Sequence, residues 1–123
     1  MIKFRFNGNV FEFSGYNAEA MRDGDMIYIN GDMNDFQFAI EIPANGVGKY
    51  TKEVENVSVS FDFPNGGESF TAYYEDGCEM ADIKINVVKC DSIIEGSFDG
   101  VLCGDDKEIG LSEGKFSIHL RVD

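Results

Sequence analysis

The sequence predicts an all-β fold, a single antiparallel β-sandwich or closed barrel of about eight to ten short strands spanning residues 1–123. The main reason is that apolar and polar residues alternate in most segments, with Gly, Asn and Asp between them. The composition agrees, because the 123 residues include 14 Gly, only 2 Pro and 43% apolar residues. A chain of this length can bury one core without metal or disulfide support.

The N-terminal segment predicts a hairpin. "IKFRF" and "NVFEF" alternate on either side of Asn7-Gly8, a dipeptide that readily adopts the positive φ angles of a type I′ turn. A two-residue loop places Phe4 opposite Phe11, so the aromatic side chains of both strands share one face. The hydrophobic pattern and the turn therefore predict the same register.

Residues 15–25 hold the only passage with helical character, and we expect at most one helical turn near residues 18–22. A second hairpin is predicted over residues 26–43, where Pro43 ends the second strand. Further strands are expected over 57–63, 70–74 and 82–88, each bounded by turn residues.

The C-terminal third contains a short repeat, "EGSFDGVL" at 95–102 and "EGKFSIHL" at 113–120. Gly96 and Gly114 each lie two positions before a Phe, so each Gly shares a strand face with Phe98 or Phe116. A Gly at such a position leaves room for a neighbouring ring or permits a bulge. We interpret the repeat as a device for building a sheet rather than as a ligand motif.

The charge limits the classes of partner. The chain has 23 acidic and 10 basic residues, a formal net charge of −13. This charge opposes direct binding to nucleic acid or to an anionic membrane, and favours cations, a basic protein surface or simply solubility. "MIKFRFNG" does not resemble a signal peptide, and no apolar run suits membrane insertion. The expected location is cytoplasmic as written, or periplasmic or cell-surface if a leader was removed.

The sequence offers little for catalysis. The only histidine, His119, alternates with apolar residues on the last predicted strand, and no nucleophile elbow, P-loop or dinucleotide-binding motif is present. Cys78, Cys90 and Cys103 are too few for a disulfide framework. We expect buried free thiols, with one strand-to-strand disulfide as the alternative. The chain is therefore predicted to be a non-enzyme without a cofactor.

Acidic loops are the candidate binding residues. Their carboxylates suit Ca²⁺, but the spacing does not follow the EF-hand pattern, so no metal ligand is assigned. The five tyrosines are a further candidate, as a stacking platform for sugar or a contact patch for protein, provided that they cluster. The predicted binding residues are Asp23, Asp25, Asp32, Asp35, Glu75, Asp76, Asp105 and Asp106.

Several motifs occur in an order that is known from other proteins. "VGKYT", "IKINVVKCDSIIEGSFDGVL" and "LSEGKFSIHL" resemble a G-x-Y turn, an I-x-I strand, an I-x-G-x-F strand and a closing G-x-F-x-V strand. This arrangement is similar to that of small β-sandwich proteins of unknown function from Bacteroidetes, many of which look like exported lipoproteins. The resemblance covers the chain in outline. It implies a sandwich and no known reaction, and the acylated cysteine of such lipoproteins is absent.

Three functional hypotheses follow. The first is a non-enzymatic binding module of unknown ligand, which acts through loops or an exposed sheet face. The second is an acidic inhibitor that imitates nucleic acid and occupies a basic groove of a nuclease, as phage anti-defence proteins do. The third is a calcium-binding or glycan-binding surface domain. The expected partner is a protein with a basic surface, and edge strands leave a dimer open.

Overall fold

The computed structural model describes all residues, Met1–Asp123, and confirms the all-β fold. Eleven strands are present, and the single 3₁₀ turn, η1, covers Gly15–Asn17. No helix is long or apolar enough to span a membrane. The strands are β1 (Ile2–Phe6), β2 (Asn9–Phe13), β3 (Ala18–Asp23), β4 (Met26–Asp32), β5 (Gln37–Pro43), β6 (Gly48–Thr51), β7 (Ser58–Phe63), β8 (Glu68–Tyr73), β9 (Asp82–Cys90), β10 (Ile93–Cys103) and β11 (Glu108–Val122).

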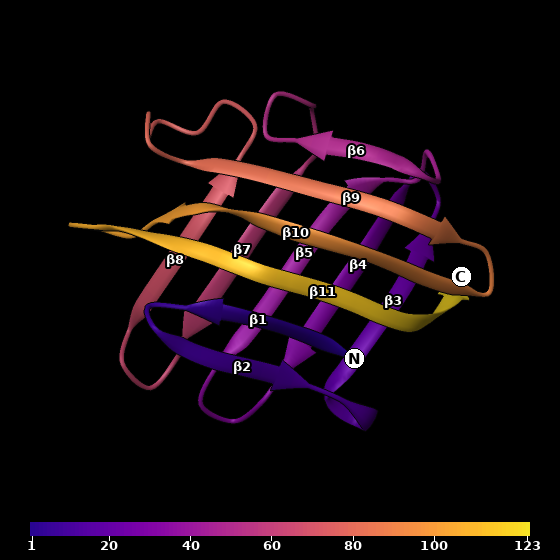
Figure 1. Ribbon diagram of the computed structural model, residues 1–123, viewed down its shortest axis with the longest axis horizontal. Coiled ribbons are helices and arrows are strands. Elements are labelled where there is room, and N and C mark those ends of the chain that lie inside the picture. The colour runs from indigo at the N-terminus through magenta and orange to yellow at the C-terminus, as the bar shows by residue number, and fades with distance from the viewer.

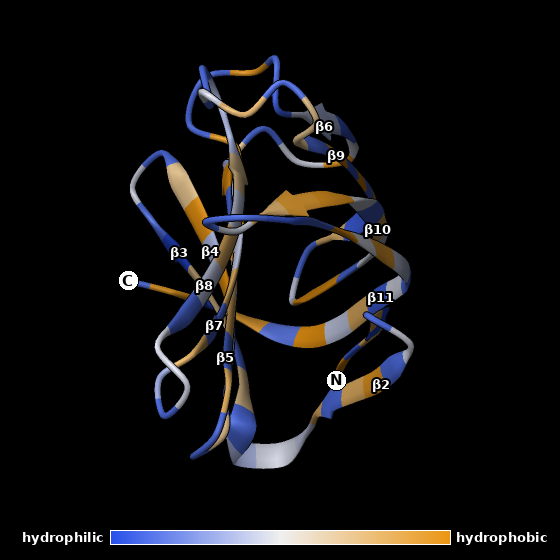
Figure 2. Ribbon diagram, turned by 90° about the vertical axis from the view of Figure 1, so that its left-hand side faces the viewer, coloured by the Kyte–Doolittle hydropathy of each residue, from blue (hydrophilic) through white to orange (hydrophobic).

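The strands form one continuous sheet in the order β2-β1-β11-β3-β4-β5-β7-β8-β10-β9-β6, and an additional β10–β11 pairing folds this sheet back on itself. The result is two layers. Sheet I consists of β3, β4, β5, β7 and β8, and sheet II of β2, β1, β11, β10, β9 and β6. The strands of the two layers cross at a steep angle in Figure 1, and Figure 2 shows the layers facing each other across the core.

The two layers are joined at two corners. At one corner, the end of β11 leaves sheet II and pairs in parallel with β3, through Leu120 opposite Ala20 and the next two residue pairs. At the other, β8 meets β10 through a single residue pair, Thr71 with Cys103. A disulfide between Cys78 and Cys103 ties the β8–β9 loop to this second corner, with a Cα–Cα distance of 6.6 Å.

The β1–β2 hairpin confirms the predicted register, because Phe4 pairs with Phe11 and Ile2 with Phe13. Asn7 and Gly8 have φ angles of 51° and 81°, as a type I′ turn requires. The β4–β5 hairpin is also confirmed, and it ends at Pro43.

The repeated Glu-Gly-x-Phe stretches lie side by side in sheet II. Gly96 pairs with Phe116, and Phe98 pairs with Gly114, so each copy places its glycine opposite the ring of the other. A Cβ added to Gly114 would lie 2.5 Å from the Phe98 ring, and one added to Gly96 would lie 2.7 Å from the Phe116 ring. The register of β10 shifts next to both Gly96 and Gly100. The repeat therefore makes room for rings and accompanies bulges, as predicted.

The core is one cluster of 27 buried hydrophobic residues, and no polar or charged residue is buried. Nine of these residues are Ile and eight are Phe. All eleven Phe of the chain belong to one network of ring contacts, which runs through Phe4, Phe38 and Phe61 at its centre. Ile, Val and Leu side chains from both sheets complete the cluster.

Three details differ from the sequence predictions. Residues 18–22 belong to strand β3, and the helical turn lies earlier, at Gly15–Asn17. Pairing with both β4 and β11 outweighs the weak helical preference of this segment, which adds an eleventh strand. Cys78 and Cys103 are not free thiols, because the loop after β8 passes beside the end of β10. Val122, which the alternation places on the same strand face as Leu120 and Phe116, lies beyond the core and is 74% exposed.

Candidate binding face

The outer face of sheet I carries ordered rows of side chains. No bulge interrupts the pairing from β3 to β8, so residues on adjacent strands stay aligned. Inward positions on these strands hold the core, and outward positions are half-buried or exposed. The three outward rows are Asp32–Gln37–Asp62–Ser69, Glu19–Asn30–Ala39–Ser60–Thr71 and Met21–Tyr28–Glu41–Ser58–Tyr73.

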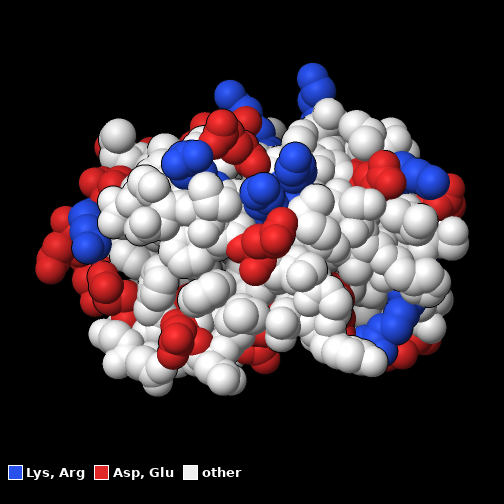
Figure 3. Space-filling model, turned by 60° about the horizontal axis from the view of Figure 1, so that its bottom comes forward, with Lys and Arg blue, Asp and Glu red and all other residues white.

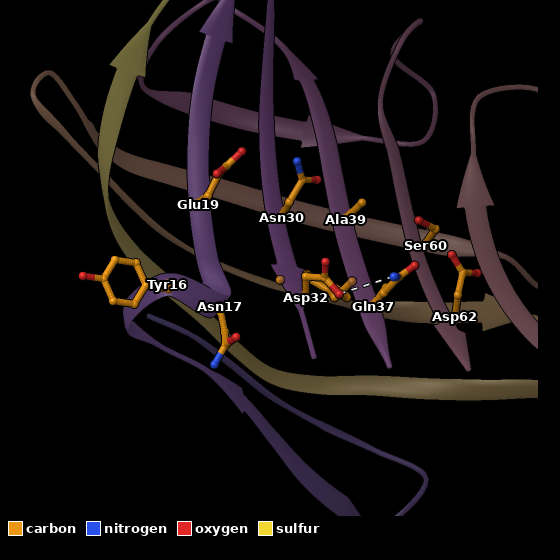
Figure 4. A pocket seen from close by; sticks show the side chains of 11 residues that line it. Tyr16, Asn17, Glu19, Asn30, Asp32, Gln37, Ala39, Ser60 and Asp62 are labelled. Atoms are coloured by element: carbon orange, nitrogen blue, oxygen red, sulfur yellow. Dashed lines mark hydrogen bonds between the residues drawn. The ribbon is translucent and has the colours of Figure 1, made fainter. Parts of the chain in front are cut away.

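The first two rows, apart from their β8 residues Ser69 and Thr71, line an open depression of about 410 Å³. Figure 4 shows Asn30, Ala39 and Ser60 side by side on three neighbouring strands. The small side chains of Ala39 and Ser60 lie at the middle of the depression. Residues of the η1 turn border one end, but the ring of Tyr16 points away from the rows. The surface is lowest at Ala39 of β5 and Ser60 of β7, because these two side chains are short.

A second depression, of about 390 Å³, lies at the other end of the same face. Glu41 and Ser58 of the third row line it, together with Tyr73 and Tyr74. The two tyrosines are 45% and 37% exposed. Tyr28 stands in the same row as Tyr73 but three strands away on β4, so it lies outside this depression.

Hydrogen bonds from neutral side chains orient three of the carboxylates of this face. The Gln37 amide donates to Asp32 at 3.3 Å, and the Ser58 hydroxyl donates to Glu41 at 3.3 Å. The Ser69 hydroxyl donates to Asp62 at 2.5 Å. These neutral donors fix the directions of the carboxylates and leave their remaining lone pairs open to solvent or a ligand.

A single ion pair borders the face. Glu19 pairs with Arg121, which lies beyond the β3 edge, at 3.2 Å. The three rows themselves contain four carboxylates and no Lys or Arg. The face is therefore negative, but Asp32, Glu41 and Asp62 already accept hydrogen bonds from uncharged side chains.

The outer face of sheet II differs in charge, because basic and acidic side chains alternate on it. Arg5 pairs with Glu113 at 2.8 Å, Lys3 stands opposite Glu12, and Lys84 stands opposite Asp99. His119 is exposed on the same face. Figure 3, seen from below Figure 1, shows a mainly uncharged surface on which Lys and Arg lie beside Asp and Glu in several separate groups. This side offers no continuous negative stripe.

The predicted acidic residues do not come together. Asp23 and Asp25 lie at the β3–β4 turn, at the opposite end of β4 from Asp32. No group of three or more Asp, Glu, Cys or His residues is placed to hold a metal ion. The others lie in separate loops: Asp35 between β4 and β5, Glu75 and Asp76 between β8 and β9, and Asp105 and Asp106 between β10 and β11.

Two of these acidic residues accept hydrogen bonds from other loop residues. Asp35 accepts a hydrogen bond from Asn65 at 3.0 Å, and one oxygen of Asp76 accepts the backbone N–H of Cys78 at 3.0 Å. Of the eight, Asp32 lines the first depression and Glu75 lines the second. The sequence reasoning missed the strand residues Asn30, Gln37, Ser58 and Ser60, whose only signal is their polar, outward position in alternating segments.

No protein-family model, curated protein or solved structure matches this chain. The resemblance to Bacteroidetes sandwich proteins therefore stays a prediction, and the function has to be argued from the face itself.

Proposed function

We propose that this protein is a non-enzymatic binding module that acts through the outer face of sheet I. The observation that carries the proposal is the set of aligned outward rows, which is hollowed by short side chains and bordered by tyrosines at one end. Polar side chains with fixed directions in a concave surface are the usual means of orienting a ligand. The face is open and its carboxylates are engaged by neutral donors, which suits recognition better than acid–base chemistry.

The acidic-inhibitor hypothesis has less support. It needs carboxylates gathered on one side to imitate phosphates, but the acidic loops lie at separate ends of the strands. Basic side chains also interrupt sheet II. The net charge of −13 then acts mainly through solubility.

The disulfide supports the exported alternative for location. Structural disulfides persist in oxidising compartments and are rare in the cytosol. Cys78 and Cys103 are bonded at a corner that otherwise has a single residue pair. We propose that the protein works in the periplasm or at the cell surface.

Two matched variants test the proposed face. Ser60→Arg places a long cation in the first depression, whereas Ser97→Arg places the same side chain at an exposed position on sheet II. Both variants and the unmodified protein are applied to a glycan array and to an array of basic peptides. We expect every ligand of the unmodified protein to survive Ser97→Arg and to be lost in Ser60→Arg. Ligands that show the reverse pattern would place the site on sheet II.

A further inference from the structure

We propose that the ligand is an extended, neutral oligosaccharide lying across the strands of sheet I along the row Tyr28–Glu41–Ser58–Tyr73. The inference rests on the proposed function and names the ligand class of the same face. Three features of this row and its neighbours carry it: the spacing of the tyrosines, the mixture of donors and acceptors between them, and the absence of basic side chains.

The two tyrosines are separated by a fixed number of strands. Tyr28 is on β4 and Tyr73 is on β8, with Glu41 of β5 and Ser58 of β7 between them. Three interstrand spacings of about 4.8 Å separate their backbones by ~14 Å. A chain of about three pyranose rings has this length, and its apolar ring faces can pack on the faces of tyrosine rings at both ends.

The side chains between the tyrosines match the hydroxyl groups of a sugar. Each sugar hydroxyl both donates and accepts hydrogen bonds, so a protein surface that carries both donors and acceptors matches it best. Between the tyrosines, Glu41 supplies acceptor lone pairs and Ser58 supplies a hydroxyl that can donate or accept. In the adjacent row, Ser60 and Thr71 supply further hydroxyls, and Asn30 supplies an amide that donates and accepts.

The charges of the face select against other ligands. An anionic glycan or a phosphate would meet four carboxylates and no Lys or Arg within the rows. A basic peptide would be attracted to these carboxylates, but its Lys and Arg groups only donate hydrogen bonds. The hydroxyl groups of a neutral sugar chain donate and accept, and they carry no charge that the carboxylates would repel.

The test is calorimetric titration with neutral oligosaccharides of increasing length from the β-glucan, xylan, mannan and galactan series. For one series we expect affinity to rise until the chain spans both tyrosines and then to level off. Tyr73→Ala should weaken binding about tenfold, because it removes one stacking surface. Val88→Ala is the control, because this exposed side chain lies on β9 of sheet II, away from the rows, and the substitution should leave the affinity within about twofold.

Tyr28 is half-buried, so two substitutions are compared at this position. Tyr28→Phe keeps the ring and should retain most of the affinity, whereas Tyr28→Ala should weaken binding about tenfold. Binding to neutral sugars should change little between about 0.05 and 0.5 M salt, because no ion pair is involved.

Two results would overturn the glycan inference. The first is that no neutral series binds, or that the binding series is unaffected by Tyr73→Ala. The second is that oligolysine binds instead, is released by salt and is lost in Ser60→Arg. That second result would keep sheet I as the binding face while identifying a basic peptide as its ligand, so the failure of the inference and the failure of the proposed function are distinguishable.

Discussion

The two sheets share one core but are built differently. Sheet I keeps an uninterrupted register from β3 to β8. Sheet II shifts register in the β1–β11, β10–β11 and β9–β10 pairings. A shift bends a strand and increases its twist, and here it coincides with glycines that receive phenylalanine rings. Sheet II therefore curves and closes the fold, and sheet I remains a regular platform.

This difference explains why the candidate site lies on sheet I. A bulge changes which residues stand opposite one another, so rows that cross several strands need an unbroken register. Sheet I preserves such rows over five strands, and its outward residues can act together. Sheet II has local charge pairs, such as Arg5 with Glu113, which fit a solvated surface.

The largest effect is expected at the corner where the two sheets are least connected by backbone pairing. Cys78→Ser combined with Cys103→Ser should lower the free energy of unfolding by about 3.5 kcal/mol, because the disulfide closes a loop with a sequence separation of 25 and restricts the unfolded chain. Urea denaturation measures this change. Cys90→Ser, which alters the free and partly buried cysteine, is the control and should cost less than about 1 kcal/mol. Equal losses in the two variants would show that the corner does not depend on the bond.

The second prediction separates the glycines of sheet II by their surroundings. Gly114→Ala should destabilise the protein by about 3 kcal/mol, because its Cβ would lie 2.5 Å from both the ring and the carbonyl oxygen of Phe98. Gly110→Ala on the same strand has nothing within 4 Å and should change stability by less than about 1 kcal/mol. Thermal denaturation of both variants measures the difference, and similar melting temperatures would contradict the role assigned to the repeat.

Much of the fold was predictable because its signals are local. The Asn7-Gly8 turn and the alternation around it determine the first hairpin, and the interpretation of Gly96 and Gly114 followed from their position relative to the phenylalanines. Strand β3 was not predictable in this way, since its partners include the end of β11, about a hundred residues away in sequence. The pairing of Cys78 with Cys103 likewise depends on where a loop passes.

The candidate site was harder to predict than the fold. Acidic loops such as Asp105-Asp106 are visible in the sequence, whereas the alignment of Ser60 with Ala39 and Asn30 depends on the register between β4, β5 and β7. Alternation indicates that such residues point outward, but not which of them stand side by side. The tyrosines show the same limit, because Tyr28 and Tyr73 belong to one row only after four strands have paired.

The smallest effect concerns a tyrosine inside the fold, in contrast to those on the face of sheet I. Tyr50 of β6 is buried, and its hydroxyl donates to the Gly46 carbonyl at 2.6 Å. Burial raises the pKa of Tyr50 above its ordinary value of 10.0, with a further contribution from Cys90. Below pH 10 the residue is neutral in both states, so its contribution to stability is complete there.

Above pH 10 the unfolded chain loses the Tyr50 proton first, and stability falls as the pH rises towards the folded-state pKa. Tyr50→Phe should cost about 1 kcal/mol at neutral pH through the lost hydrogen bond, and should make unfolding less sensitive to pH in the alkaline range above pH 10. Denaturant midpoints across this range test the assignment. If both proteins lose stability with the same slope, the interior tyrosine is not the titrating group, and the alkaline sensitivity must come from residues outside the core.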